Sequence, residues 1–75
     1  MYSKLKSIVE GAAKEKGIKI SSFQGDRIRA IERKLDEEEI KIEEAVNMLK
    51  AINDGFDFKF NNDDFLKIER KLKRL

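Results

Sequence analysis

The chain has 75 residues, with no cysteine, no histidine and no proline, and 43% of its residues are charged. It is long enough for one small domain with a marginal hydrophobic core, so a dimer is favoured. The missing cysteines exclude disulfides and thiolate zinc sites, and without histidine the commonest general base is absent. We therefore expect no enzyme, no metal site and no cofactor.

The net charge of +2 conceals a strong pattern along the chain. Residues 1–20 carry +3, residues 21–35 carry +2, residues 36–57 carry −6 and residues 58–75 carry +3. A polyanion would meet the basic ends, although solvated helix faces also explain such runs. No stretch is apolar enough for a membrane span, and the first residues do not resemble a signal peptide, so we expect a cytoplasmic protein with no membrane contact.

The first predicted elements are an amphipathic helix and a short strand. The helix has one apolar face, formed by Leu5, Ile8, Val9, Ala12 and Ala13. Gly17 stands where this helix would end in the left-handed conformation. Residues 18–20 alternate apolar, polar, apolar, which predicts a short strand. Ser21 and Gln24 have the form of a capping box for the next helix, and Gly25-Asp26 offers a second start.

Residues 26–52 are predicted to form one long helix. They contain neither Gly nor Pro, and residues spaced alternately three and four apart run along one face. These residues are Ile28, Ile31, Leu35, Glu38, Ile42, Ala45, Leu49 and Ile52. Two members of the segment argue for a competing interpretation, because Glu38 falls on the apolar face and Ile40 falls outside it. In that interpretation the chain breaks near residues 38–40 into a helical hairpin, with Ile40 buried at the turn.

A second short strand and a final helix complete the chain. Gly55 ends the preceding helix, and alternate phenylalanines between residues 56 and 60 predict the strand. Asn61 is predicted to cap the last helix, with Phe60 and Phe65 at the spacing of a hydrophobic staple. That helix has an apolar stripe of Phe65, Ile68, Leu72 and Leu75, and an adjoining basic face of Lys67, Arg70, Lys71 and Arg74.

The predicted core or dimer interface combines the apolar residues of the central and final elements. Its members are Ile28, Ile31, Leu35, Ile42, Val46, Leu49, Ile52, Phe56, Phe58, Phe60 and Phe65. The aromatic residues are assigned to this core rather than to an exposed platform for nucleotide bases.

The two halves of the chain are similar to each other. Residues 23–35 (FQGDRIRAIERKL) and 60–72 (FNNDDFLKIERKL) are identical at seven of 13 positions, including the whole of IERKL. Upstream, GIKI (17–20) corresponds to GFDF (55–58). We therefore expect a single domain, residues 1–75, built from two helix–strand–helix copies at about 3–36 and 40–75.

The predicted fold class is all-α, in the order helix, short strand, long helix, short strand, helix. A four-helix domain with a two-stranded mini-sheet is the alternative. The favoured order resembles the histone fold. Ile20-Ser21 resembles the step before the long helix of small archaeal and bacterial histones, and FNNDDF (60–65) resembles their second-strand ending. The family usually carries Arg and Thr just before that ending, whereas residues 57–59 here are Asp-Phe-Lys, so Asp64 lacks its expected Arg.

The resemblance implies a non-enzymatic dimer that binds double-stranded DNA without sequence preference. In the histone fold, paired strands of two subunits present amides and basic residues to phosphates. The DNA-binding residues implied in this way are Lys4, Lys6, Lys14, Lys16, Lys19 and Lys59. The alternative function is a small protein-interaction module, a regulator or inhibitor that acts on a protein partner through its apolar faces. A helix-turn-helix is a third hypothesis.

Overall fold

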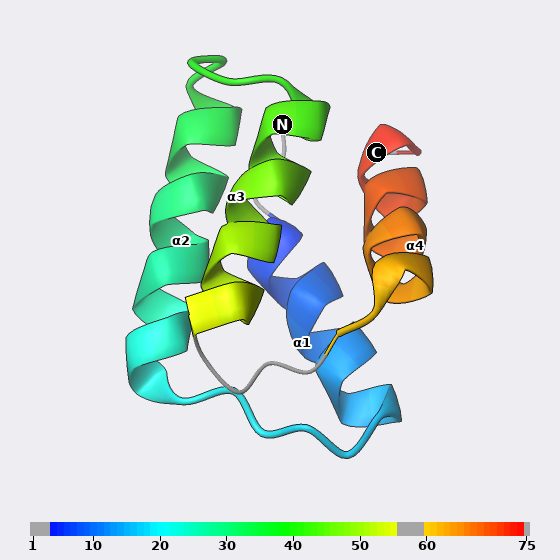
Figure 1. The fold of residues 1–75 in the computed structure, drawn as a ribbon. Coiled ribbons are helices and arrows are strands. Elements are labelled where there is room, and N and C mark those ends of the chain that lie inside the picture. The colour runs from blue at the N-terminus through cyan, green and yellow to red at the C-terminus, as the bar shows by residue number, and fades with distance from the viewer. Residues whose placement is uncertain (1–3, 56–59, 75) are drawn as a thin grey trace.

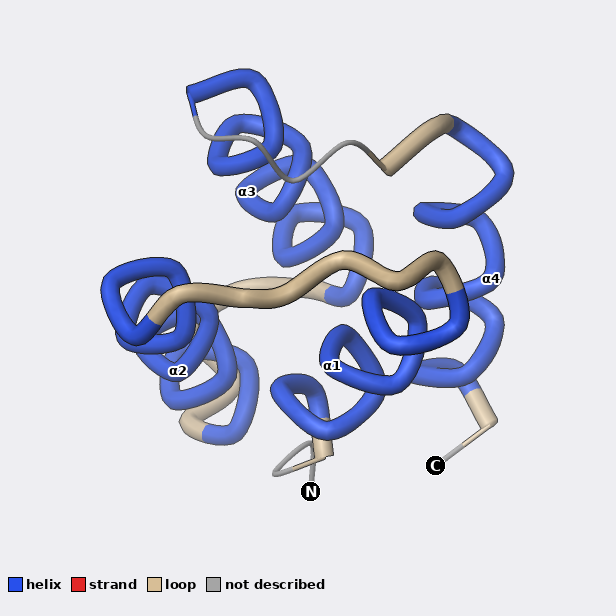
Figure 2. Tube along the Cα trace, turned by 90° about the horizontal axis from the view of Figure 1, so that it is seen from below, coloured by secondary structure: helices blue, strands red, loops and turns tan. Residues whose placement is uncertain are grey.

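The computed structural model describes residues 4–55 and 60–74. These residues form four helices, α1 (Leu5–Glu15), α2 (Ser22–Asp36), α3 (Ile42–Gly55) and α4 (Asn62–Lys73). Successive helices run in opposite directions (Figure 1). Each helix packs against two others, in the cyclic order α1, α2, α3, α4 and back to α1 (Figure 2). The all-α class is confirmed, with the four helices of the alternative prediction. None of the described helices is long and apolar enough to cross a membrane.

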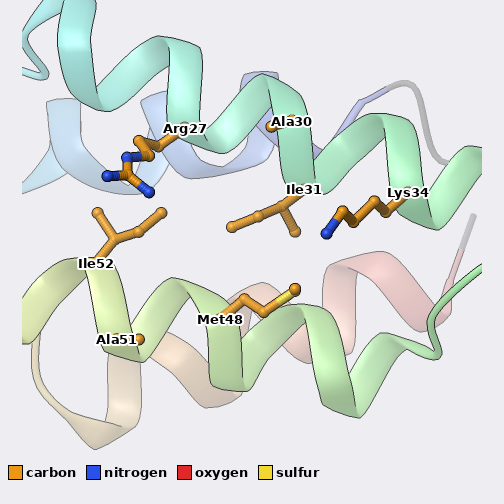
Figure 3. A pocket seen from close by; sticks show the side chains of 7 residues that line it. All are labelled: Arg27, Ala30, Ile31, Lys34, Met48, Ala51 and Ile52. Atoms are coloured by element: carbon orange, nitrogen blue, oxygen red, sulfur yellow. The ribbon is translucent and has the colours of Figure 1, made fainter.

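One apolar stripe from each helix, joined by Phe60, fills the space between the helices. The buried apolar side chains are Leu5, Val9, Ala13, Ile28, Ile31, Leu35, Ala45, Val46, Leu49, Ile52, Phe60, Phe65, Ile68 and Leu72. Burying a Leu, Ile or Phe side chain stabilises the fold by roughly 1.5–3 kcal/mol. Of the predicted core or interface residues, Ile42 is half-buried, and Phe56 and Phe58 lie outside the described residues. Ile31 and Ile52 also line a groove on the outside of α2 and α3 (Figure 3).

The prediction of one long helix over residues 26–52 is wrong. α2 ends at Asp36 and α3 begins at Ile42, so the competing helical hairpin is the one observed. Glu38 has a φ of 59°, in the left-handed region. The N–H of Glu39 donates to the carbonyl of Lys34 (2.9 Å) and that of Glu38 to the carbonyl of Leu35 (3.1 Å), the two hydrogen bonds of a Schellman motif. Ile40 is half-buried against the core just beyond this turn.

The strand predicted at residues 18–20 is not formed, and no strand occurs among the described residues. Gly17 has a φ of 70° and ends α1 in the predicted left-handed conformation. The following segment packs Ile18 and Ile20 on the core and leaves Lys19 exposed, so its alternation belongs to a connection between helices. Of the second predicted strand, residues 56–59 lie outside the described residues. Phe60 meets Phe65 edge to face at 5.7 Å, as a hydrophobic staple requires.

The predicted capping box of α2 is present, and the predicted Asn61 cap of α4 also forms a capping box. Gln24 N–H donates to Ser21 Oγ (3.2 Å) and Ser21 N–H donates to Gln24 Oε1 (3.0 Å), so α2 starts at Ser22 and not beyond Gly25. At the start of α4, Asp64 N–H donates to Asn61 Oδ1 (3.0 Å) and Asn61 N–H donates to Asp64 Oδ2 (2.9 Å). These local hydrogen bonds satisfy backbone donors that would otherwise lack partners at a helix start.

Replacing Glu38 with Gly should raise the free energy of unfolding by about 0.5–1 kcal/mol, because Gly adopts the left-handed conformation without a Cβ clash. Urea denaturation monitored by circular dichroism measures the change. In one continuous helix the same substitution would instead lower stability by about 1 kcal/mol, so the sign distinguishes the two folds. Glu37→Gly is the matched control: it removes the same charge at a φ of −84° and should destabilise the protein.

Candidate nucleic-acid interface

The outward face of α4 is strongly basic. Its exposed cations are Lys67, Arg70, Lys71 and Arg74. Within the described residues, none of these four forms an ion pair. Glu69, the only acidic residue of the segment 65–74, is bonded to Lys73 at 3.0 Å. That hydrogen bond raises the pKa of Lys73 above its usual value, so Glu69 is paired with Lys73 and not with the four cations of the outward face.

Part of this charge distribution stabilises α4 itself. Asp63 and Asp64 lie in the first turn, where the helix dipole favours negative charge, and Arg70 and Lys71 lie near the last turn, where it favours positive charge. Each such placement contributes about 0.3–1 kcal/mol, and the effect is confined to the terminal turns. Lys67 lies between those turns, so the dipole does not account for it.

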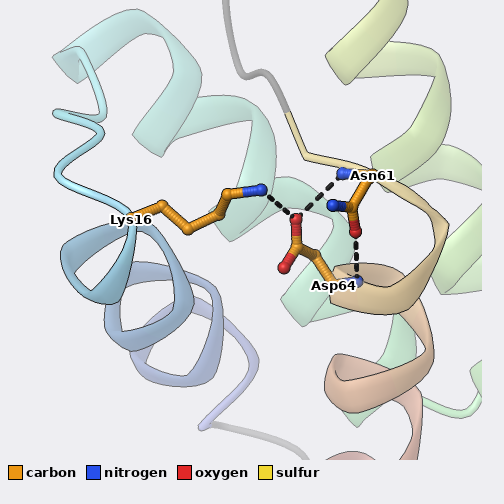
Figure 4. Close-up of polar contacts among 3 residues, drawn as sticks. All are labelled: Lys16, Asn61 and Asp64. Atoms are coloured by element: carbon orange, nitrogen blue, oxygen red, sulfur yellow. Dashed lines mark hydrogen bonds and ion pairs between the residues drawn. The ribbon is translucent and has the colours of Figure 1, made fainter.

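A salt bridge ties the end of α1 to the start of α4. Lys16 Nζ lies 2.6 Å from Asp64 Oδ2, and the same oxygen accepts the Asn61 N–H (Figure 4). Partial burial raises the pKa of the Asp64 carboxyl, but the hydrogen bonds from Lys16 and Asn61 and the charges of Lys16 and Lys67 outweigh it. The net result is a pKa below the ordinary 3.8. Lys16 is thus the basic partner of Asp64.

The structure does not gather the predicted DNA-binding lysines into one surface. Lys4 and Lys6 lie at the start of α1, whereas Lys14 and Lys16 lie at its other end, about 12 Å away at 1.5 Å per residue. Lys19 is exposed on the connection to α2. Lys59 lies outside the described residues.

Two of these lysines also have structural roles. Lys16 forms the salt bridge to Asp64, and Lys6 is half-buried. A Cβ added at Gly25 would lie 3.5 Å from Lys6 Cε, so this side chain runs along the backbone of α2. The N–H of Lys6 donates to Glu32 Oε2 at 2.9 Å, which supplies the start of α1 with an acceptor from α2. Lys6 and Lys16 are therefore less available for contacts with DNA than the exposed lysines of the predicted set.

The acidic residues gather at the end of the bundle where α2 turns into α3. Exposed carboxylates there come from Glu37, Glu38, Glu39, Glu43 and Glu44. These carboxylates repel a polyanion from this end of the bundle, and one of them, Glu43, lies 3.8 Å from Lys73 of α4. Among the described residues, no group of three or more potential ligands could hold a metal ion.

Comparison with family models, curated proteins and solved structures found no match to this chain. The histone resemblance implied a DNA-binding site on the first helix and the predicted strands, and not on the last helix. The spacing of the four cations on α4 was visible in the sequence, but their freedom from ion pairs depends on the tertiary structure.

Replacing Lys16 with Met should lower the free energy of unfolding at neutral pH by about 0.5–1 kcal/mol, as expected for an ion pair at the partly exposed edge of the bundle. Because the folded-state pKa of Asp64 is lowered, its contribution is present above pH 3.8 and is lost as the pH falls through the folded-state value. The difference between variant and wild type should therefore shrink in acid. Urea denaturation at neutral pH and at about pH 2 measures it.

Lys14→Met is the matched control, because Lys14 is exposed on the same helix and forms no ion pair within the described residues. It should change stability little at either pH. An equal loss in both lysine variants would show that the salt bridge contributes nothing specific.

Proposed function

We propose that the protein is a cytoplasmic, non-enzymatic protein that binds double-stranded DNA without sequence preference, through the basic face of α4. The observation that supports this is one exposed stripe of four cations, three on α4 and Arg74 directly after it, none of which forms an ion pair within the described residues. Cations that are already paired would have to give up a partner to contact phosphate. These four would instead release counterions from the DNA, which is the main source of non-specific affinity.

The dimensions of α4 suit a duplex. Lys67 and Arg74 are seven residues apart, about 10.5 Å along the helix axis, and duplex DNA carries one negative charge per ~1.7 Å. The major groove is about 12 Å wide and admits a helix. Long Lys and Arg side chains would then reach the phosphates on either side of the groove.

The chemistry of this face favours phosphate contacts over base recognition. Leu66, 49% exposed, lies beside the cations and offers no hydrogen bond to a base edge. Asn61 and Asp64 at the start of α4 are occupied by the capping box. Contacts of the four cations with phosphate would carry no sequence information, so binding through them would depend on backbone charge.

The rest of the bundle is compatible with an approach from the side of α1 and α4. α1 runs antiparallel to α4, so Lys4 at its start lies at the same end of the bundle as Arg74 (Figure 1). The acidic turn between α2 and α3 lies at this same end (Figure 1), and its Glu43 approaches Lys73 of α4 to 3.8 Å, so a polyanion is disfavoured over that end of the bundle. Lys4 is exposed at that end.

The test is fluorescence anisotropy of a mixed-sequence duplex titrated with protein at several salt concentrations. Contacts from the four cations predict a slope of log K against log[salt] near about −3.6. Arg70→Gln with Arg74→Gln should weaken binding and reduce the slope by about 2, because each Gln removes one phosphate contact and preserves helix propensity. A duplex of different sequence should bind equally well.

Lys14→Gln with Lys19→Gln is the control, because it removes two exposed cations from the site first predicted. It should leave both affinity and slope unchanged. If this control abolishes binding and the α4 variant does not, the site lies on α1 and its connection. No binding by the wild-type protein at low salt would refute the DNA proposal altogether.

A further inference from the structure

A groove of about 280 Å³ runs along the outside of the bundle between α2 and α3. Its floor is apolar, with buried Ile31 and Ile52 and half-buried Met48 between them (Figure 3). Ala30 and Ala51 are exposed on its two sides and add little bulk. Because the side chains of Ala30 and Ala51 are small, another pair of helices could approach the centre of the groove closely.

The α2 wall of the groove is a single stripe with an apolar end and two positive charges. Phe23, Arg27, Ala30 and Lys34 follow one another at helical spacing of three or four residues. Phe23 is 55% exposed, and the Arg27 guanidinium lies 5.5 Å from its ring centroid. An exposed Phe beside an apolar groove favours contact with another apolar surface.

The α3 wall carries the opposite charge. Glu44 lies four residues before Met48, one turn along the same face of α3. Lys34 is two residues from the end of α2 and Glu44 two residues from the start of α3, so both lie at the same level of the bundle. Within the described residues, neither Lys34 nor Glu44 forms an ion pair.

We propose that the occupant of this groove is a second copy of the chain, related by a two-fold axis that runs along the groove. This rotation keeps each residue at its level and exchanges the two walls, so α2 of one copy packs on α3 of the other. Lys34 of each copy then faces Glu44 of its partner, and the two apolar floors meet between them. The charge complementarity is therefore repeated twice in one interface.

The other two-fold arrangement is unfavourable. An axis across the groove would place α2 of one copy antiparallel on α2 of the other, with Lys34 of each copy near Arg27 of its partner. Like charges brought together in an interface are strongly destabilising. The charges of the groove thus select one symmetric arrangement.

The dimer is expected to be weak. The Cα trace measures 30 × 23 × 18 Å, so one side of the bundle offers a footprint of roughly 600 Å². A standard stable interface buries about 800 Å² on each partner. Association should accordingly appear at micromolar or higher protein concentrations.

Charge reversal tests this interface by sedimentation equilibrium without nucleic acid, from about 10 μM to 1 mM protein, a range suited to a weak complex. Lys34→Glu and Glu44→Lys should each weaken self-association about tenfold or more, because each homodimer then contains two like-charged pairs. An equimolar mixture of the two variants should associate like the wild type. In the mixed dimer, one pair keeps the native charges and the other has them exchanged.

Lys14→Glu is the matched control, because it makes the same charge change on α1, away from the groove, and should not alter association. Glu44 Oε1 also accepts the Lys41 N–H at 3.0 Å, so Glu44→Lys could disturb the start of α3. Circular dichroism checks folding, and Met48→Glu, which leaves that hydrogen bond intact, should abolish the dimer.

A wild-type protein that stays monomeric throughout this range would overturn the proposal and leave the groove to a foreign partner. A dimer unaffected by Lys34→Glu and Met48→Glu would place the interface elsewhere. Failure of the mixture to regain association would refute the pairing of Lys34 with Glu44. All three outcomes are independent of whether the protein binds DNA.

Discussion

The chain reversal at residues 37–41 is the constraint on which the rest of the bundle depends. One continuous helix over residues 22–55 would be about 50 Å long, whereas α1 and α4 would each cover less than 20 Å of it. Much of its apolar face would then remain in water. The left-handed conformation of Glu38 costs about 1–2 kcal/mol, and each Leu or Ile it allows the chain to bury returns roughly 1.5–3 kcal/mol. Burial of side chains such as Ile28, Leu35 and Leu49 therefore outweighs one strained residue.

The same reversal separates the charges of the chain in space. It concentrates the acidic residues of the middle segment at the end of the bundle where α2 turns into α3, while the exposed cations of α4 follow the outward face of that helix. The salt bridge between Lys16 and Asp64 holds α1 against α4 and places the start of α4 firmly on the core. Fold and electrostatic surface thus follow from the same packing of helices in cyclic order.

Local signals in the sequence predicted local structure well. The Ser21–Gln24 capping box, the Asn61 cap and the helix end at Gly17 each depend on residues within a few positions of each other, and all three are confirmed. Periodicity failed at residues 26–52, because two antiparallel helices that share one core keep nearly the same apolar spacing as one long helix. The polar Glu38 on that face and Ile40 outside it were the signals of the break. Three alternating residues, 18–20, could not distinguish a strand from a connection packed on the core.

The candidate site was harder to predict, because the freedom of a charge depends on which distant residues approach it. Lys16 and Lys67 are the same residue type, yet the structure pairs Lys16 with Asp64 and leaves Lys67 exposed without an ion pair among the described residues. The helix order also separates the two proposed surfaces. The α2–α3 pair, which carries the groove, and the α1–α4 pair lie on opposite sides of the bundle (Figure 2). A dimer formed through the groove would therefore direct its two basic α4 faces away from each other. Such a dimer would hold two separate duplex segments together rather than enclose one, and simultaneous engagement of both faces would raise its avidity without any new contact.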